Sequence, residues 1–252
     1  MQVRIFPNSD ALAHVAAHEA AALIRAAVQR NGHARIVVAT GNSQVAMMAK
    51  LVVLPDIPWA QVEAFHLDEY VGLPATHPAS FRFWIRTRFE EKVRPGVVHY
   101  LEGDAADLDA ELERYAALLA AGPLDLAFIG IGENGHIAFN DPPVADFLDP
   151  LRVKRVPLDE MCRLQQVGEG HFSNLAAVPK EAVTFTCPQL MAAGNLVCSV
   201  PDLRKANAVK DSLEGPLSEA CPGSLLRVHP RATLYLDTES ASKLSPVWTN
   251  RP

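Results

Sequence analysis

Short apolar runs rich in β-branched residues alternate with segments of helical period along most of this 252-residue chain. The clearest runs are RIVVA at Arg35–Ala39, Val62–His66 and LDLAFIG at Leu124–Gly130. Nearly continuous apolar strands that alternate with helices are typical of a parallel sheet with helices on both faces. The pattern therefore predicts a three-layer, doubly wound α/β fold with a mostly parallel sheet. We expect residues 1–252 to form one domain.

The sequence also indicates where several helices begin and end. In one long stretch it shows no clear helix or strand pattern. A stripe of apolar residues predicts a helix over about Asp10–Gln29, and Asn31-Gly32 supplies its stop. Further helices are expected from Ser80, over Ala105–Ala121 and over about Arg204–Leu213, with later strands at Asn195–Val200 and Thr233–Asp237. From about 140 to 178 the pattern weakens among prolines and glycines, which predicts a lid-like excursion.

Charge and cysteine usage narrow the kind of protein. The formal net charge of −6 argues against a nucleic-acid or anionic-membrane partner, because both require a positive surface. The four cysteines are dispersed, without a C-x-x-C pair or zinc-finger spacing, so we expect reduced thiols and no metal site. The first ten residues lack a secretory pattern, and no run approaches eighteen apolar residues. Cytoplasmic residence is the expectation.

Three polar clusters follow predicted strands, where ligands bind in Rossmann-like sheets. In the first, Asp68 and Glu69 come directly after the strand Val62–His66, with no adjacent lysine or arginine to pair with them. A carboxylate in that place suits a general base. The structural alternative is that Asp68 caps a turn or a helix, and chain position alone does not separate the two.

The second cluster is GIGENGHIAFND at Gly130–Asp141. Its glycines allow tight turns and close approach of a ligand, and His136 and Asp141 supply an imidazole and a carboxylate for proton transfer. A glycine-rich turn with a packed histidine is the alternative. The segment lacks the full dinucleotide fingerprint, so we expect no nicotinamide and no other cofactor.

The third cluster is the strand-to-helix turn Thr40-Gly41-Asn42-Ser43. Free amides at a helix N-terminus favour an anion, and this turn is a candidate phosphate site. An ordinary N-cap by Asn42 or Ser43 is the alternative.

Taken together, these segments resemble the glucosamine-6-phosphate deaminase/isomerase family, in the same order over almost the whole chain. FHLDEYVGLPATHPASF is similar to the DEY segment of that family, and GIGENGHIAFNDPP to its G-x-G-x-[DN]-G-H-I-[AG]-F-N-E-P segment. LLRVHPRATLYLD resembles its last histidine-containing turn and strand. The resemblance implies conversion of glucosamine 6-phosphate to fructose 6-phosphate and ammonia, and a small phosphorylated aminosugar as the partner. Galactosamine 6-phosphate is an alternative substrate, and a homo-oligomer is possible.

The resemblance also implies roles for individual residues. Asp68 would move a proton between C2 and C1 of the open-chain aminosugar, and His136 would open the pyranose ring. Asn134 and Asp141 would support His136, with Asp141 standing where the family usually has glutamate. The expected binding set is Thr40, Gly41, Asn42, Ser43, Gly135 and Lys205, with Arg163 as a candidate addition.

Two departures from the family pattern concern the phosphate. The family loop usually reads T-G-G-[ST]-P, whereas here Thr40 begins TGNSQ. The arginine that the family carries on its lid has no clear counterpart between Gln165 and Phe172. Arg163 or His171 are candidate substitutes, and Lys205 is the best-matched phosphate cation.

Two other functions agree less well with these segments. A 6-phosphogluconolactonase would share the fold, but its corresponding segments typically read D-E-R and G-H-x-A-S-L-F-P, unlike the DEY and GHIAFN segments here. A non-catalytic sugar-phosphate sensor usually carries a DNA-binding helix-turn-helix, and here the first predicted helix leads directly into the sheet.

Overall fold

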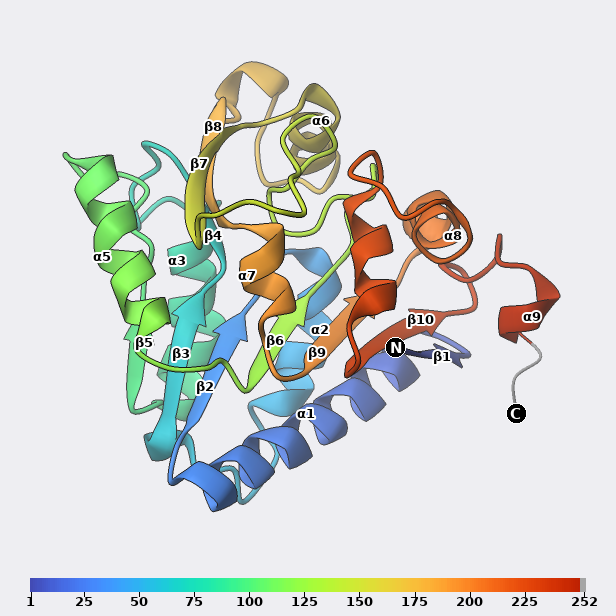
Figure 1. Ribbon diagram of the computed structural model, residues 1–252, viewed down its shortest axis with the longest axis horizontal. Helices are drawn as coiled ribbons and strands as arrows, with labels where there is room; N and C mark the ends of the chain where they lie inside the picture. Colours follow the sequence, from blue (N-terminus) through green and yellow to red (C-terminus); the bar gives the residue numbers. More distant parts are fainter. Residues whose placement is uncertain (250–252) are drawn as a thin grey trace.

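A computed structural model describes residues 1–249 and contains two sheets (Figure 1). The larger sheet has seven strands, all paired in parallel. Their spatial order is β1 (Gln2–Phe6), β10 (Ala232–Asp237), β9 (Leu196–Val200), β6 (Leu126–Ile129), β2 (Ala34–Val38), β3 (Val62–His66) and β5 (Val97–His99). The smaller sheet is antiparallel, in the order β4 (Asp68–Tyr70), β8 (Glu181–Phe185) and β7 (Val153–Pro157).

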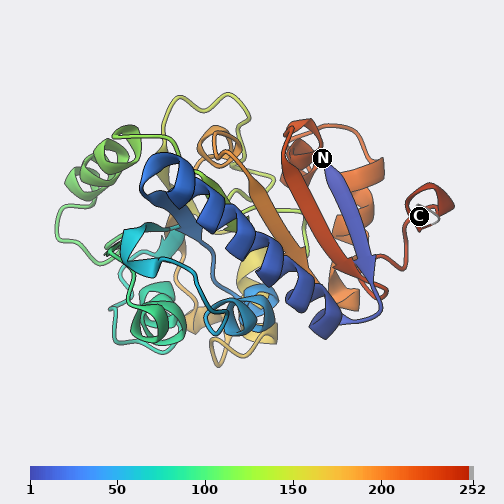
Figure 2. The ribbon, with the colours of Figure 1, turned by 90° about the horizontal axis from the view of Figure 1, so that it is seen from below.

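Helices cover both faces of the larger sheet, which confirms the expected three-layer α/β fold. Figure 1 shows α5 and α7 in front of the strands and α2 and α3 behind them, and Figure 2 shows the same layers from below. The α-helices are α1 (Ser9–Asn31), α2 (Asn42–Leu51), α3 (Phe81–Ile85), α4 (Glu91–Val93), α5 (Leu108–Ala120), α6 (Glu160–Gly168), α7 (Cys187–Met191), α8 (Ala206–Glu214) and α9 (Pro246–Thr249). Shorter turns of helix are η1 (Trp59–Gln61), η2 (Arg86–Glu90, a π-helix), η3 (Leu175–Ala177), η4 (Leu203–Lys205) and η5 (Pro222–Val228).

Helix α1 shows how the sequence sets an element's ends. The Asn8 side chain accepts a hydrogen bond from the Ala11 amide at 2.9 Å and caps the N-terminus, while Gly32 ends the helix in the left-handed region at φ 79°. By length and composition alone this helix is apolar enough to cross a membrane, contrary to the expectation of no such run. However, nine of its residues are buried in the protein core, as in a core helix.

The chain order of the larger sheet places a switch point between β2 and β6. From β2 the chain adds β3 and then β5 on one side, and it returns to place β6 on the other side of β2. Loops that leave two neighbouring parallel strands in opposite directions open a crevice at the carboxyl ends of those strands. The segments after β2 and β6 are Thr40–Ser43 and Gly130–Asp141. Two of the three polar clusters therefore flank this crevice.

The expected excursion at 140–178 is more regular than its sequence suggested. It contains β7, α6 and η3. Strand β7 pairs with β8, and β8 pairs with β4, which follows β3 of the larger sheet in the chain. Figure 1 shows this part over the end of the sheet toward which β2, β3 and β6 point. Phe172 of this part packs with Tyr70 and Phe139 in an apolar cluster that is separate from the main core. We call residues 140–178 the cap.

Strands β1 and β5 lie at opposite edges of the larger sheet and were not predicted. The single-domain prediction over 1–252 stays a prediction, and its last three residues lie outside the described part of the chain.

Candidate active site

One cleft lies at the carboxyl ends of β2, β3 and β6 and under the cap. It brings together residues from all three polar clusters and from α6. Its polar lining consists of Thr40, Asn42, Ser43, Asp68, His136, Gln165, Gln166, Glu169 and Lys205. Asp68 and His136 therefore line the same cleft as the anion-holding turn.

The turn after β2 presents an uncapped helix N-terminus to this cleft. Gly41 is the cap residue of α2, at φ 93°, and no side chain caps the helix in the described chain. Neither Asn42 nor Ser43 acts as the N-cap, so the structural alternative for this turn is wrong. Because the first amides of α2 have no side-chain partner and the helix dipole favours negative charge, the turn suits a phosphate.

Gln44 stands where the phosphate loop of the similar family usually has proline, and its side chain fixes the position of this turn. Its side chain is fully buried, and Nε2 donates to the Ile129 carbonyl at 3.1 Å. Ile129 is the last residue of β6, on the other side of the switch point. The glutamine side chain therefore connects the anion-holding turn to the neighbouring strand end.

Strand β4 places the neighbouring carboxylates of Asp68 and Glu69 in different environments. Asp68 lines the cleft, and its carboxylate forms no hydrogen bond or ion pair with any residue in the described chain. Burial raises the pKa of Asp68 well above its usual range, and the charge of Glu69 adds to the effect. A carboxyl group of raised pKa is a stronger base when ionised, which suits proton removal from carbon near neutral pH.

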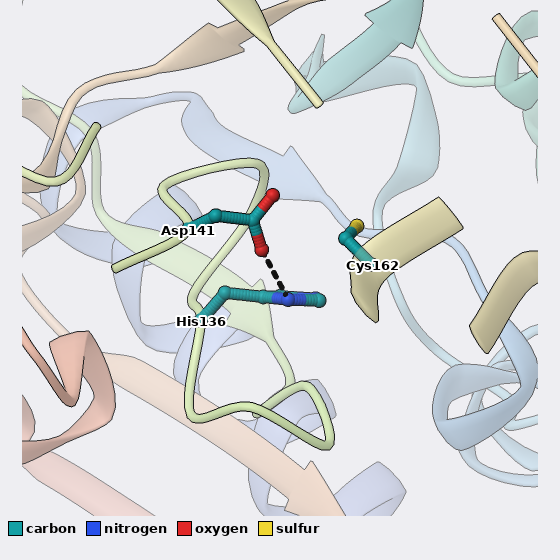
Figure 3. A group of neighbouring side chains, drawn as sticks. All are labelled: His136, Asp141 and Cys162. Carbon is teal, nitrogen blue, oxygen red and sulfur yellow. Dashed lines mark ion pairs between the residues drawn. The ribbon is translucent and has the colours of Figure 1, made fainter. Parts of the chain in front are cut away.

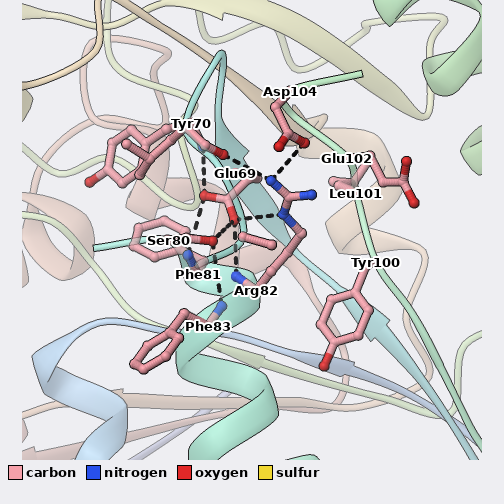
Figure 4. A network of polar contacts seen from close by, with 12 residues as sticks. Glu69, Tyr70, Ser80, Phe81, Arg82, Phe83, Tyr100, Leu101, Glu102 and Asp104 are labelled. Carbon is pink, nitrogen blue, oxygen red and sulfur yellow. Dashed lines mark hydrogen bonds and ion pairs between the residues drawn. The ribbon is translucent and has the colours of Figure 1, made fainter. Parts of the chain in front are cut away.

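Glu69 is enclosed by donors instead (Figure 4). Its Oε2 accepts hydrogen bonds from Ser80 Oγ at 2.7 Å and from the Arg82 amide at 2.9 Å, and its Oε1 accepts from the Tyr70 and Phe81 amides. The Arg82 side chain is buried and also contacts Asp104 at 2.8 Å. Glu69 therefore fixes the start of α3 and has no free acceptor direction toward the cleft. Although the helix that begins after Ser80 is rich in arginine, Arg82 is buried in this network and does not lie on a charged outer face.

The glycines of the loop after β6 make room for the His136 ring. A Cβ at Gly132 would lie 2.2 Å from the imidazole Cε1 and Nε2, so the ring lies directly against the Gly132 backbone. The Gly132 amide also donates to the His136 carbonyl at 2.9 Å. Only glycine at position 132 lets the imidazole occupy this place.

His136 contacts a buried carboxylate (Figure 3). Its Nδ1 lies 2.8 Å from Asp141 Oδ1, but the oxygen lies off the direction of a ring N–H, so the contact is an ion pair rather than an aligned hydrogen bond. Burial would raise the pKa of Asp141, yet the contacts with His136 and Asn134 outweigh it and lower the pKa below its usual value. Asp141 is therefore anionic near neutral pH and places a negative charge beside the His136 ring.

Asn134 supports this pair without lining the cleft. Its Nδ2 donates to Asp141 Oδ1 at 2.9 Å, and its Oδ1 accepts from the His136 amide at 3.0 Å. The side chain thus orients His136 through its backbone and its carboxylate partner rather than through the ring. Gly135, at φ 86°, does not line the cleft either. Its carbonyl accepts from the Gly223 amide, so it holds the loop against η5.

Lys205 and Glu169 place opposite charges in the cleft that the anion-holding turn lines, and they come from different parts of the chain. Lys205 follows β9 and is 5 % exposed, and burial lowers its pKa. Its Nζ lies 3.9 Å from Oε1 of Glu169, which follows α6 in the cap. Burial would raise the pKa of Glu169, but contacts with His171 and Lys205 lower it below its usual value. The cap therefore brings a negative charge to this end of the cleft.

Arg163 was expected as a substitute for the missing lid arginine, and the structure contradicts this. Its guanidinium donates to the Leu175 and Val178 carbonyls at 2.6 and 3.1 Å, and it does not line the cleft. It joins α6 to η3 within the cap. His171 contacts Glu169 at 3.4 Å and does not line the cleft either.

Sequence reasoning missed the three cleft residues of the cap, Gln165, Gln166 and Glu169. Gln166 Oε1 accepts a hydrogen bond from the Tyr70 hydroxyl at 2.7 Å, which connects α6 to β4. A signal existed in the spacing, because residues 165, 166 and 169 lie on one face of a helix. The signal was hidden because the helix itself was not predicted.

An uncapped helix N-terminus, a buried lysine, an unpartnered aspartate and a histidine–aspartate pair in one cleft define an acid–base site for a small anionic ligand. The family model for glucosamine-6-phosphate isomerases and 6-phosphogluconolactonases matches residues 7–142. The chain belongs to this family.

Similar proteins agree over nearly the full length. The glucosamine-6-phosphate deaminase of Arthrobacter sp. (strain FB24) is 36% identical over 250 residues, which are 97% of this chain and 93% of the relative. That of Bacillus cytotoxicus is 34% identical over 223 residues, 88% and 83% of the two chains. A solved monomeric glucosamine-6-phosphate deaminase matches with a TM-score of 0.88 at 30% identity, covering 96% of this chain and 99% of the other.

Another branch of the family shares the fold. The 6-phosphogluconolactonase from Trypanosoma brucei matches with a TM-score of 0.79 at 19% identity, covering 97% of this chain and 98% of the other. That likeness concerns the fold alone.

Proposed function

We propose that this protein converts glucosamine 6-phosphate and water to fructose 6-phosphate and ammonia. The observation that carries the proposal is the single cleft in which Asp68, His136 and the uncapped turn at Thr40–Ser43 face the same space. A six-carbon sugar phosphate has its reacting carbons at the end opposite the phosphate. The proposed reaction requires acid–base groups and an anion-holding turn in one cleft, and this cleft has both.

His136 opens the pyranose ring in this proposal. Ring opening requires a proton to leave the C1 hydroxyl and a proton to reach the ring oxygen. Imidazole is the side chain that is best suited to give and take a proton near neutral pH. The Asp141 carboxylate, 2.8 Å from Nδ1, holds the ring against Gly132 and fixes its orientation.

Asp68 then moves the proton from C2 to C1. Removal of the C2 proton gives an enolamine, and protonation at C1 gives an imine at C2, which water hydrolyses to the ketose and ammonia. Because no side chain of the described residues occupies the acceptor oxygens of Asp68, the carboxylate is available to the substrate carbon. Its raised pKa brings it closer to the pKa of the proton it removes.

Lys205 and the first amides of α2 hold the phosphate. Lys205 lines the cleft with Thr40, Gly41, Asn42 and Ser43. The Glu169 carboxylate, which contacts Lys205, competes with the phosphate for this cation. A phosphate of charge near −2 displaces the weaker carboxylate contact when the substrate binds.

The setting of this reaction follows from its substrate. A phosphorylated sugar is charged and stays inside the cell, so we place the protein in the cytoplasm. The four cysteines are free thiols, as expected in a reducing compartment.

The test is to offer the purified protein glucosamine 6-phosphate, galactosamine 6-phosphate and 6-phosphogluconolactone in parallel. Ammonia and ketose phosphate are measured for the aminosugars, and acid release for the lactone. We expect equal amounts of ammonia and fructose 6-phosphate from glucosamine 6-phosphate. Rapid lactone opening without ammonia from either aminosugar would replace this proposal with the lactonase.

A further inference from the structure

Three side chains of different chemistry meet where the cap contacts the loop after β6. Nitrogen, oxygen and sulfur atoms of His136, Asp141 and Cys162 lie within 4.8 Å of one another (Figure 3). His136 and Asp141 come from the loop after β6, and Cys162 comes from α6, twenty-one residues further along the chain. Within residues 1–249 this is the one group of three such side chains.

A second observation points to a ligand. His136 Nδ1 is buried and has no aligned hydrogen-bond partner within the described chain, although His136 is only 9 % exposed. A buried ring nitrogen normally has its donor or acceptor direction filled. Here the nearest acceptor, Asp141 Oδ1 at 2.8 Å, lies off that direction, and Cys162 Sγ lies within 4.8 Å, so both neighbours are potential ligands of one ion.

The donor set selects the class of ion. Magnesium and calcium prefer oxygen ligands, whereas one sulfur, one nitrogen and one oxygen suit Zn²⁺. Zinc with ligand distances of about 2.0 to 2.3 Å places its tetrahedral ligands roughly 3.5 Å apart. The present separations include 2.8 Å between His136 Nδ1 and Asp141 Oδ1 and do not exceed 4.8 Å, a range that contains this value. Three protein ligands leave the fourth position to water.

We propose that His136 Nδ1, Asp141 and Cys162 Sγ bind one Zn²⁺ and that this ion inhibits the enzyme. On binding, the Cys162 S–H bond breaks, a Zn–S bond forms and the proton passes to solvent. The imidazole keeps its remaining proton on Nε2 and no longer exchanges one at Nδ1. The inhibition rests on the proposed function, because it acts through the ring-opening role of His136; the binding of zinc does not.

Direct binding is measured first. Tag-free protein, reduced and freed of metal with a chelator, is titrated with ZnCl₂ by calorimetry and with CoCl₂ by absorption, because a Co²⁺–thiolate bond gives a charge-transfer band. We expect one ion per chain and a thiolate band. Outer-shell partners of metal ligands are already worth about 10- to 100-fold in affinity, so Cys162→Ser should weaken binding at least about tenfold.

Cys221→Ser is the matched control. Cys221 is a partly exposed thiol whose Sγ lies 3.5 Å from Ser212 Oγ, outside the group of three. It should bind zinc as the unchanged protein does. Cys162→Ala is the second variant if the serine variant does not fold, as judged by circular dichroism. Absence of one-to-one binding, or equal binding by the Cys162 variants, would overturn the zinc site.

Inhibition is measured second, as ammonia release at increasing free Zn²⁺. Cys162→Ser should keep the basal rate and lose the inhibition, while Cys221→Ser should stay inhibited. Zinc that binds through Cys162 without slowing the reaction overturns the inhibition. A protein that binds zinc through Cys162 and releases no ammonia even without it refutes the proposed function and leaves the binding site standing.

Discussion

Asp68 and Glu69 are neighbours in β4, both are buried, and they are built for opposite purposes. Glu69 accepts hydrogen bonds from a hydroxyl and three backbone amides and contacts the Arg82 guanidinium at 3.4 Å. The Asp68 carboxylate has no such partner in the described chain and faces the cleft. Successive side chains of a strand point to opposite sides, so one residue step separates the two environments.

The difference shows how burial alone fails to identify a functional carboxylate. Burial raises the pKa of both groups, and for Glu69 the surrounding donors oppose that rise. A buried carboxylate surrounded by donors contributes to structure, and a buried carboxylate without donors costs stability. We interpret the cost at Asp68 as the consequence of keeping a base available, and the donors at Glu69 as what fixes the adjoining backbone.

The largest expected effect is on catalysis at Asp68. Asp68→Asn should lower the rate of ammonia release from glucosamine 6-phosphate by about 10³-fold, because a general base typically contributes about 10²- to 10⁴-fold. The melting temperature should not fall. Initial rates with saturating substrate measure the effect. A variant with more than a tenth of the original rate would remove Asp68 from the mechanism.

The next effect is on stability at Glu69. Glu69→Ala leaves Arg82 and several amides without their acceptor, and removal of one partner of a buried pair costs about 3 to 5 kcal/mol in the free energy of unfolding. Glu69→Gln, which keeps the shape and one acceptor oxygen, is the matched control and should lose less. Urea unfolding measures both. Equal stability of the alanine variant and the unchanged protein would show that the network contributes nothing.

A smaller effect is expected at His136. His136→Gln should slow turnover by about 10²-fold, because general acid–base catalysis of ring opening is lost while phosphate binding is kept. The inhibition constant of inorganic phosphate reports on that binding and should change little. Turnover of the cyclic substrate at the original rate would contradict the ring-opening role.

The pH dependence of stability gives a further contrast at Asp68. Because its pKa is raised on folding, the native state holds a proton that the unfolded state releases, so this group's stabilising contribution is present at low pH and is lost as pH rises through the folded pKa. Asp68→Asn should therefore gain stability relative to the unchanged protein between about pH 4 and neutral pH. Unfolding curves at several pH values measure it. If the stability gain of the variant increased as the pH falls, the pKa of Asp68 would not be raised on folding.

The smallest effect is expected at Glu169. Glu169→Gln removes the carboxylate 3.9 Å from Lys205 and should tighten binding of inorganic phosphate by about two- to fivefold, the range of a weak ion pair. Gln165→Glu is the reverse test, because it adds a negative charge to the same face of α6 and should weaken the binding of inorganic phosphate. Phosphate inhibition of turnover measures both. Weaker phosphate binding by Glu169→Gln would assign the carboxylate a supporting role.

The sheet was predictable because its strands are local and strongly apolar. RIVVA and LDLAFIG read as strands without any tertiary information, and each leads directly into a polar cluster. Strands β1 and β5 were missed because they lie at the sheet edges, where pairing on one side is enough and the sequence is less apolar.

The cap was not predictable in the same way. Its helix α6 is stabilised by contacts from distant parts of the chain, such as the Tyr70 hydroxyl on Gln166. The cationic side chain expected there, Arg163, bonds within the cap, and the charge that reaches the cleft is negative. The meeting of Cys162 with His136 and Asp141 likewise has no signature in spacing, because α6 reaches them only after β7 has turned the chain back. Such arrangements depend on tertiary packing rather than on local pattern.

Transfer of hydrogen at the sugar carbons tests the account most directly. The protein and its Asp68→Asn variant are incubated with glucosamine 6-phosphate in deuterium oxide, and deuterium at C1 of the product and at C2 of the remaining substrate is followed by nuclear magnetic resonance. We predict solvent deuterium at C1 of fructose 6-phosphate with the unchanged protein and no exchange at either carbon with the variant. Exchange that continues after the carboxylate is removed would contradict the assignment of Asp68 as the base.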